Sequence, residues 1–167
     1  TNVAEDFAVA DLLSRGRVVL GVSPGERKAE FDAAGVSWDD REDRFREAVE
    51  LVRTLWTQGA VQYIGEHYQF PLEAEGQPGW RREPYTPPFV DQWRRGQAKP
   101  DYLPMLPRPV QWPHPPIWVT GWRRDTIEWA AKRGLGFRCS SLETDDEVRT
   151  KIGWYGDALE AAGRDRN

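Results

Sequence analysis

The sequence has little of what several protein classes need. It contains one Cys, Cys139, and two His, His67 and His114, among 167 residues. A single Cys excludes an internal disulfide and any Cys-based cluster, and two His disfavour a His-rich centre, so we expect no metal site. No stretch approaches the roughly 18 consecutive apolar residues of a membrane span, and no charged start followed by an apolar run indicates a signal peptide. We therefore expect a soluble, cytoplasmic protein.

An excess of basic charge is also missing. The chain has 27 Asp and Glu residues against 23 Lys and Arg residues, which gives a net charge of −4. A protein that holds nucleic acid by neutralising phosphates needs a basic face, and a polybasic membrane anchor needs clustered cations. We therefore expect no nucleic-acid partner and no membrane partner.

Tryptophan and proline, in contrast, are abundant and unevenly placed. There are nine Trp and thirteen Pro, and twelve of the Pro lie between Pro71 and Pro116 together with Trp80, Trp93 and Trp112. Residues 61–70 are typical of a hairpin that turns at Gly65. After them the Pro content excludes regular structure, and a stretch this long is usually a functional excursion or disordered. We expect a hairpin followed by a Pro/Trp-rich excursion over about residues 60–115.

The flanks alternate between helical and strand patterns. On 3–13 the helical pattern places Val3, Phe7, Ala10 and Leu13 on one face. On 40–57 the same spacing places on one face Phe45, Ala48, Val49, Val52, Leu55 and Trp56. Thr144 and Glu147 form a capping box, and Asp125 and Glu128 have the same spacing. The predicted helices are 3–13, 40–57, 125–133 and 144–162, and the predicted strands are 17–22, 116–120 and 135–139.

Alternation of strands and helices indicates an α/β fold with parallel strands and right-handed crossovers. Val19, Val119 and Phe137 should then lie side by side on neighbouring strands. About three such strands cannot close a barrel, since an eight-fold barrel typically needs roughly 250 residues. Because the chain also lacks a starting Met, we interpret residues 1–167 as one domain that is part of a TIM (β/α)8 barrel.

Ligands of parallel α/β folds bind at the carboxyl ends of the strands. That rule selects Ser23 to Gly25, Gly121 to Arg124, and Ser140 with Ser141. Gly121 permits a tight passage into a helix whose N-terminus attracts phosphate, and Arg123 and Arg124 add positive charge there. A cation at that end opposes the helix dipole, so a bound anion would relieve the conflict. The alternative is two solvated arginines on an ordinary βα turn.

Three further residues near these strand ends have two interpretations each. Glu30 could act as a base or bind substrate, or be a surface group. Trp122 could stack on a planar ligand or serve packing alone. Cys139 is better explained as a small core residue than as a nucleophile, because no His lies near it in the sequence.

The order of several segments resembles the luciferase-like flavin-dependent monooxygenases. The segment Leu13 to Val22 (LSRGRVVLGV) is similar to the family's stretch before and within its fourth strand, and Glu30, Phe31 and Gly35 match the residues that follow. The resemblance continues in register over nearly the whole chain. Its further landmarks are Leu55-Trp56, Tyr63 to Gly65, Pro107 to Val119, and Thr126 to Ala131 followed by Gly134.

This resemblance implies a TIM barrel of which the chain covers the third through the sixth helix. It implies reduced FMN, or in one branch a deazaflavin coenzyme, bound at the carboxyl end of the barrel. The loop Gly121–Arg124 would hold the flavin phosphate, and Ser23 and Gly25 would border the flavin. The family often has Gly in place of Ser23 and a Ser-rich loop in place of Trp122 to Arg124. Its catalytic His residues lie on early strands outside this chain, so no catalytic residue is assigned.

Three hypotheses follow. The first is a monooxygenase that oxygenates an organic substrate with O2 and reduced flavin, with a flavin reductase as partner and a homo-oligomeric complete protein. The second keeps the fold but uses a deazaflavin coenzyme for hydride transfer. The third is a non-catalytic binding module that binds a carbohydrate or a Pro-rich partner through Trp80, Trp93 and Trp112.

Overall fold

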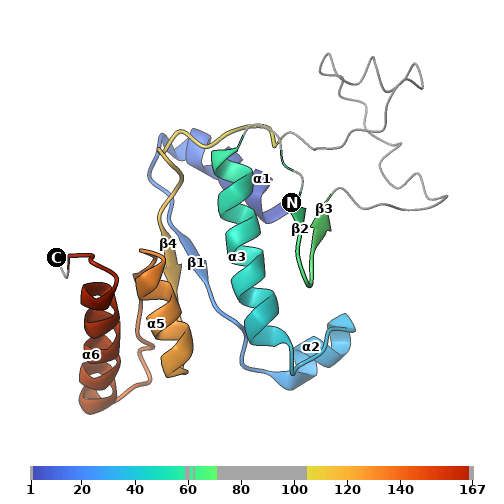
Figure 1. Cartoon of the computed structure of the whole chain (residues 1–167). Coiled ribbons are helices and arrows are strands. Elements are labelled where there is room, and N and C mark those ends of the chain that lie inside the picture. The colour runs from blue at the N-terminus through green and yellow to red at the C-terminus, as the bar shows by residue number, and fades with distance from the viewer. Residues whose placement is uncertain (1, 59–60, 62, 71–104, 166–167) are drawn as a thin grey trace, which may run out of the picture.

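A three-stranded parallel sheet with helices packed on it forms the centre of the molecule (Figure 1). The computed structural model describes residues 2–58, 61, 63–70 and 105–165. The strand order is β1-β4-β5, and both pairings are parallel as predicted. The strands are β1 (Leu20–Val22), β4 (Ile117–Val119) and β5 (Gly136–Phe137), and the helices are α1 (Asn2–Ser14), α2 (Lys28–Ala34), α3 (Arg41–Thr57), α5 (Arg124–Lys132) and α6 (Asp145–Ala161).

The predicted neighbours in the sheet are correct, but the predicted register of the first strand is wrong. Val119 pairs with Phe137 on one side and with Val22, not Val19, on the other. Val19 precedes β1 and is 48% exposed. The strand starts only at Leu20, whose N–H donates to the carbonyl of Pro116 (2.9 Å).

Helices cover one face of the sheet and leave the other open. Ile117 and Val119 are buried, whereas Trp118 between them is 45% exposed, as expected when successive side chains of a strand point to opposite faces. Trp118 lies in register between Gly21 and Gly136. A Cβ at Gly136 would come within 2.9 Å of the Trp118 ring, so glycine makes room for the indole.

The main core joins the covered face of the sheet to α3 and α1. Val49, Leu55 and Trp56 of α3 are buried, as the helical periodicity predicts. On α1 the predicted face is wrong in part: Phe7 packs against the core, but Val3 and Leu13 are exposed, and the buried residues are Ala4, Ala8 and Asp11. The small Ala side chains allow a close approach to α3, and Trp56 Nε1 donates to the Ala4 carbonyl (2.9 Å).

The helices α2 and α5 differ from the prediction, and the start of α6 agrees with it. The helix α2 was not predicted at all. α5 begins at Arg124 with Arg123 as its N-cap residue and no side-chain capping bond, so the expected capping box at Asp125 is wrong. The capping box of Thr144 and Glu147 at the start of α6 is confirmed. α5 and α6 pack through Ala131, Ala158 and Leu159.

The predicted hairpin is also confirmed. It consists of the antiparallel strands β2 (Tyr63–Ile64) and β3 (Gln69–Phe70). Both carboxylate oxygens of Glu47 on α3 hold it, because they accept the backbone N–H groups of His67 (2.9 Å) and Tyr68 (2.8 Å). Of the expected excursion, residues 71–104 lie outside the described part of the chain, and residues 105–115 form neither helix nor strand.

Candidate functional site

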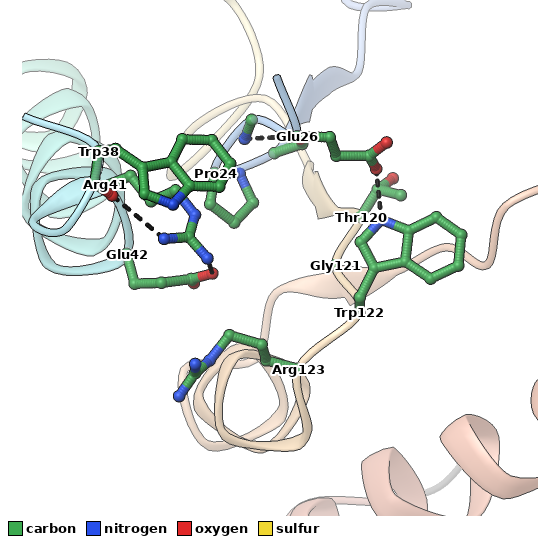
Figure 2. A pocket seen from close by; sticks show the side chains of 11 residues that line it. Pro24, Glu26, Trp38, Arg41, Glu42, Thr120, Gly121, Trp122 and Arg123 are labelled. Carbon is green, nitrogen blue, oxygen red and sulfur yellow. Dashed lines mark hydrogen bonds and ion pairs between the residues drawn. The ribbon is translucent and has the colours of Figure 1, made fainter. Parts of the chain in front are cut away.

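A pocket opens where β1 and β4 end at their carboxyl sides. The Thr120 N–H donates to the Val22 carbonyl (2.9 Å), so the two strands end side by side and their loops leave the sheet together. Between the loops and the start of α3 lies a pocket of about 300 Å³ (Figure 2). Its lining residues are Ser23, Pro24, Gly25, Glu26, Trp38, Arg41, Glu42, Thr120, Gly121, Trp122 and Arg123.

The β1–α2 loop forms one wall of this pocket. The Gly25 N–H donates to Ser23 Oγ (3.1 Å), which closes a tight turn directly after the strand. Gly25 has a φ of +88°, and a Cβ there would come within 2.7 Å of the Phe31 ring. Both the left-handed backbone and the close ring require glycine at this position. The loop therefore keeps a fixed, narrow path beside the pocket.

The N-terminus of α3 forms a second wall. The guanidinium of Arg41 lies 4.0 Å above the centre of the Trp38 ring and donates to the Trp38 carbonyl (3.1 Å). Glu42 accepts the Thr126 hydroxyl of α5 (2.7 Å), which joins the first turns of the two helices. In Figure 2, Arg41 lies between Trp38 and Glu42 at the edge of the pocket. The Arg41 guanidinium is thus held in place by the Trp38 ring on one side and by an ion pair with Glu42 (3.9 Å) on the other.

The β4–α5 loop forms the third wall. Gly121 is buried, and a Cβ there would lie 3.2 Å from Thr126 Cγ2. The guanidinium of Arg123 donates to both carboxylate oxygens of Asp125, at 3.0 and 3.1 Å. Arg46 of α3 also donates to Asp125 (3.0 Å). Asp125, at the start of α5, therefore serves as an internal counter-ion for two arginines.

These contacts perturb the two partners in opposite directions. Hydrogen bonding to Arg123, followed by that to Arg46, lowers the pKa of Asp125 from 3.8 to about 2. The same pair raises the pKa of Arg123. A carboxylate at a helix N-terminus also suits the helix dipole. The expected conflict between the arginines and the dipole is thus partly relieved by Asp125 itself.

The structure brings together five of the seven predicted binding residues and places two elsewhere. Ser23, Gly25, Gly121, Trp122 and Arg123 line the pocket. Arg124 instead donates to Glu128 (2.7 Å) and lies 5.6 Å from the Trp154 ring of α6. Glu30 is an exposed residue of α2 that pairs with Arg27 (3.5 Å).

Several lining residues were missed by sequence reasoning. Trp38, Arg41 and Glu42 precede or begin α3, which is the helix that the periodicity predicts best. In a βα unit the helix after a strand begins near the carboxyl end of that strand, and α3 follows β1 in the chain. This chain order could have identified the three residues as neighbours of the pocket. Glu26 had no such signal, because only the folded loop brings its carboxylate to the Trp122 indole N–H.

Neither a candidate metal cluster nor a candidate membrane-spanning helix occurs among the described residues. No group of three His, Cys, Asp or Glu side chains there has the arrangement that a metal ion needs. No helix among these residues combines the length and the apolar character required to cross a membrane.

Comparison with known proteins agrees with the resemblance and with the fold. A family model described as "Luciferase-like monooxygenase" matches residues 1–167. The oxygenase component of a flavin-dependent trigonelline monooxygenase from Acinetobacter baylyi is 25% identical over 162 residues, which cover 95% of this chain and 36% of that protein. An F420-dependent glucose-6-phosphate dehydrogenase from Amycolatopsis mediterranei is 41% identical over 70 residues, or 40% of this chain and 21% of the dehydrogenase.

A solved structure shows the same similarity in three dimensions. The monooxygenase RslO1 from Streptomyces bottropensis superimposes with a TM-score of 0.73 at 28% identity, over 98% of this chain and 41% of RslO1. The chain thus spans about two fifths of RslO1, and its sheet and helices form part of a TIM barrel. On the match of the family model to residues 1–167, the chain belongs to the luciferase-like monooxygenase family.

Proposed function

We propose that the pocket holds the phosphate of a flavin and that the protein acts as a flavin-dependent monooxygenase on a small organic molecule with O2 and reduced FMN. The observation that carries the proposal is the position of the pocket. It lies at the carboxyl ends of two parallel strands, beside Gly121, Arg123 and the N-terminus of α5. Such strand ends and helix N-termini are the usual places for phosphate in α/β folds.

The chemistry of the lining fits a phosphate group. Arg123 and Arg41 supply two guanidinium groups beside the start of α5, where the first backbone N–H groups of a helix lack intrahelical carbonyl acceptors. Of these, the Thr126 N–H donates to the Asp125 carboxylate (3.0 Å). The carboxylates of Glu26 and Glu42 already accept hydrogen bonds from Trp122 and Thr126. The volume of about 300 Å³ is at the lower end for ligand sites, which span roughly 300–1,000 Å³. It suits the phosphate end of the cofactor better than a whole ring system.

In this proposal the chain's residues bind and orient, and the cofactor supplies the redox chemistry. When bound, reduced flavin provides the electrons with which O2 is activated. Arg123 and the α5 N-terminus fix one end of the cofactor. Trp38 and Trp122 form apolar walls that limit the access of water. No residue of this chain is assigned a catalytic role.

Three wider features belong to the same proposal. Residues 1–167 would form one part of a single barrel domain. A separate reductase would supply the reduced flavin, and the word "component" in the name of the Acinetobacter relative supports a two-protein system. A homo-oligomer of the complete protein remains our expectation.

A specific observation favours a second candidate, hydride transfer with a deazaflavin coenzyme. The segment of 41% identity belongs to an F420-dependent dehydrogenase. The same phosphate pocket would serve either cofactor. Reconstitution with each cofactor separates the two: a substrate that donates hydride should bleach the oxidised deazaflavin without O2, whereas reduced FMN should give an oxygenated product only when O2 is present.

The alternative of a non-catalytic binding module rests on three Trp residues in a row. Trp112 is 86% exposed, whereas Trp80 and Trp93 lie outside the described residues. That row therefore stays a prediction, while membership in a family of monooxygenases favours an enzyme.

The test of the phosphate assignment compares two neighbouring arginines. Arg123 lines the pocket, and Arg124 pairs with Glu128 outside it. We expect Arg123→Ala to weaken FMN binding about tenfold, because it removes a charge-assisted hydrogen bond to the phosphate. Arg124→Ala is the matched control and should change the affinity less than about twofold.

Riboflavin, which lacks the phosphate, completes this experiment. Both flavins are titrated by quenching of their fluorescence, and Arg123→Ala should leave riboflavin binding unchanged. Equal loss of FMN affinity in the two arginine variants would contradict the assignment. So would wild-type protein that binds riboflavin as tightly as FMN.

A further inference from the structure

A buried ion pair outside the pocket contacts one of its walls. Lys151 Nζ on α6 lies 3.1 Å from Glu143 Oε1 in the loop after β5, and their side chains are only 8% and 1% exposed. The same Nζ lies 4.3 Å from the centre of the Trp122 ring. The ammonium group is therefore shared between a carboxylate and the indole that borders the pocket.

Trp122 is fixed at a second point on its edge. Its indole N–H donates to the carboxylate of Glu26 in the loop after β1 (Figure 2). The loops after all three parallel strands thus meet at one side chain: Glu26 follows β1, Trp122 follows β4, and Glu143 follows β5. Trp122 is 46% exposed even with these contacts, so little other than the three loops holds its ring in place.

Stability alone is a poor reason for this ion pair. Two charges removed from water lose hydration that their attraction repays only with good geometry and further hydrogen bonds, so an apolar pair of similar size is often as stable or more stable. Here Glu143 Oε1 also accepts the Ser140 N–H (3.0 Å) and the neighbouring Cys139 thiol contacts the carboxylate, but Oε2 is buried without a well-formed hydrogen bond among the described residues. The pair is incompletely satisfied, which points to a positional role.

We propose that Glu143 and Lys151 are positioning residues that hold Trp122 in place as a wall of the flavin pocket. Lys151 attracts the face of the ring by a cation–π interaction, which is stronger where water is excluded. Glu143 keeps the ammonium group under the ring. The inference rests on the proposed function for its ligand, but the geometry of Trp122 can be tested without any flavin.

The decisive variant replaces the pair as a unit. Removing Lys151 alone would leave Glu143 as an uncompensated buried charge and could unfold the region. The double variant Glu143→Gln, Lys151→Met keeps the side-chain volumes and retains an acceptor for the Ser140 N–H. Its melting temperature should stay within a few degrees of the wild type. Lys151→Arg is the conservative control, because a guanidinium can both pair with Glu143 and stack on Trp122.

Two measurements follow on these proteins. The first is the steady-state ¹H–¹⁵N NOE of the Trp122 indole N–H, assigned among the nine Trp by Trp122→Phe. It reports picosecond to nanosecond motion, and it should fall in the double variant and stay near the wild-type value in Lys151→Arg. The second is FMN affinity, which should drop about three- to tenfold in the double variant, corresponding to a cation–π term of a partly desolvated site, and recover in Lys151→Arg.

The outcomes separate this inference from the proposed function. A double variant with wild-type indole NOE and wild-type FMN affinity overturns the inference. A second contradicting result is a double variant that loses FMN affinity and melts far below the wild type but keeps a wild-type indole NOE. That result would indicate a general structural role of the ion pair and would overturn the inference as well. If wild-type protein does not bind FMN, the proposed function fails, and the indole NOE alone decides whether the pair positions Trp122.

Discussion

Asp11 offers the sharpest test of how the fold holds the site in place. This carboxylate is fully buried on α1. Its Oδ2 accepts the backbone N–H groups of Val110 (2.7 Å) and Gln111 (2.9 Å), and its Oδ1 accepts Gln111 Nε2 (2.8 Å). Gln111 Nε2 also donates to the Val18 carbonyl (2.9 Å). Asp11 thus ties α1 to the segment that leads into β4, and the Gln111 side chain links this segment to the one that leads into β1.

These hydrogen bonds set the expected loss of unfolding free energy when Asp11 is replaced. Hydrogen bonds to a charged group contribute about 1.5–3 kcal/mol each, but contacts that share one partner are not additive. In Asp11→Asn one acceptor oxygen becomes an amide that faces donors, so we expect about 2–3 kcal/mol of destabilisation. In Asp11→Ala all three bonds are lost and two partly buried backbone N–H groups are left without an acceptor, so we expect about 3–5 kcal/mol.

The assay is urea unfolding followed by far-UV circular dichroism, with the free energy of unfolding obtained by linear extrapolation. The matched control is Asp6→Asn, a change of the same kind at an exposed position of the same helix. It should alter the free energy of unfolding by less than about 0.5 kcal/mol. A loss below about 1 kcal/mol in Asp11→Asn, or a loss equal to that of the control, would refute the reasoning.

Three further predictions concern single contacts. Thr144→Ala should cost about 1 kcal/mol of unfolding free energy, because it removes the capping box of α6. Asp125→Asn should cost at most about 1 kcal/mol at pH 7, since the carboxylate is 48% exposed. Because the folded pKa of Asp125 is about 2 against 3.8, its contribution is present above about pH 4 and lost as the pH falls towards 2. Gly65→Ala should speed amide exchange in the hairpin, because its Cβ would collide with the Glu47 carboxylate, whereas Gly153→Ala meets no atom within 4 Å.

Each of these has an outcome that contradicts it. For the cap, unchanged denaturation midpoints in Thr144→Ala would do so. For Asp125, the contradicting result is a difference in unfolding free energy between wild type and Asp125→Asn that is as large at pH 2 as at pH 7. For the hairpin, equal amide exchange rates in the two alanine variants would show that Glu47 does not hold it.

Local rules worked where they act within one element. The periodicity of α3 identified three of its four buried residues, Val49, Leu55 and Trp56 but not Leu51, because a helix of 3.6 residues per turn puts these three on one face whatever it packs against. The capping box of α6 formed as predicted, since both of its partners lie within one turn. The same reasoning failed on α1, where contact with Trp56 selected the small face with Ala4 and Ala8 over the face with larger apolar residues.

The sequence by itself determined the alternation of elements, the parallel sheet and the strand ends at which the pocket lies, because hydrophobic period, turn residues and chain direction are local or topological properties. Only the tertiary structure decided which neighbouring side chains enter the pocket. Arg123 and Arg124 are adjacent and chemically identical, yet one pairs with Asp125 at the pocket and the other with Glu128 on the helix surface. Successive residues leave a helix start about 100° apart, so only one of the two arginines faces the pocket. Both carboxylate partners lie on α5 itself, but the other walls of the pocket come from the β1–α2 loop and the start of α3, which no local pattern places there.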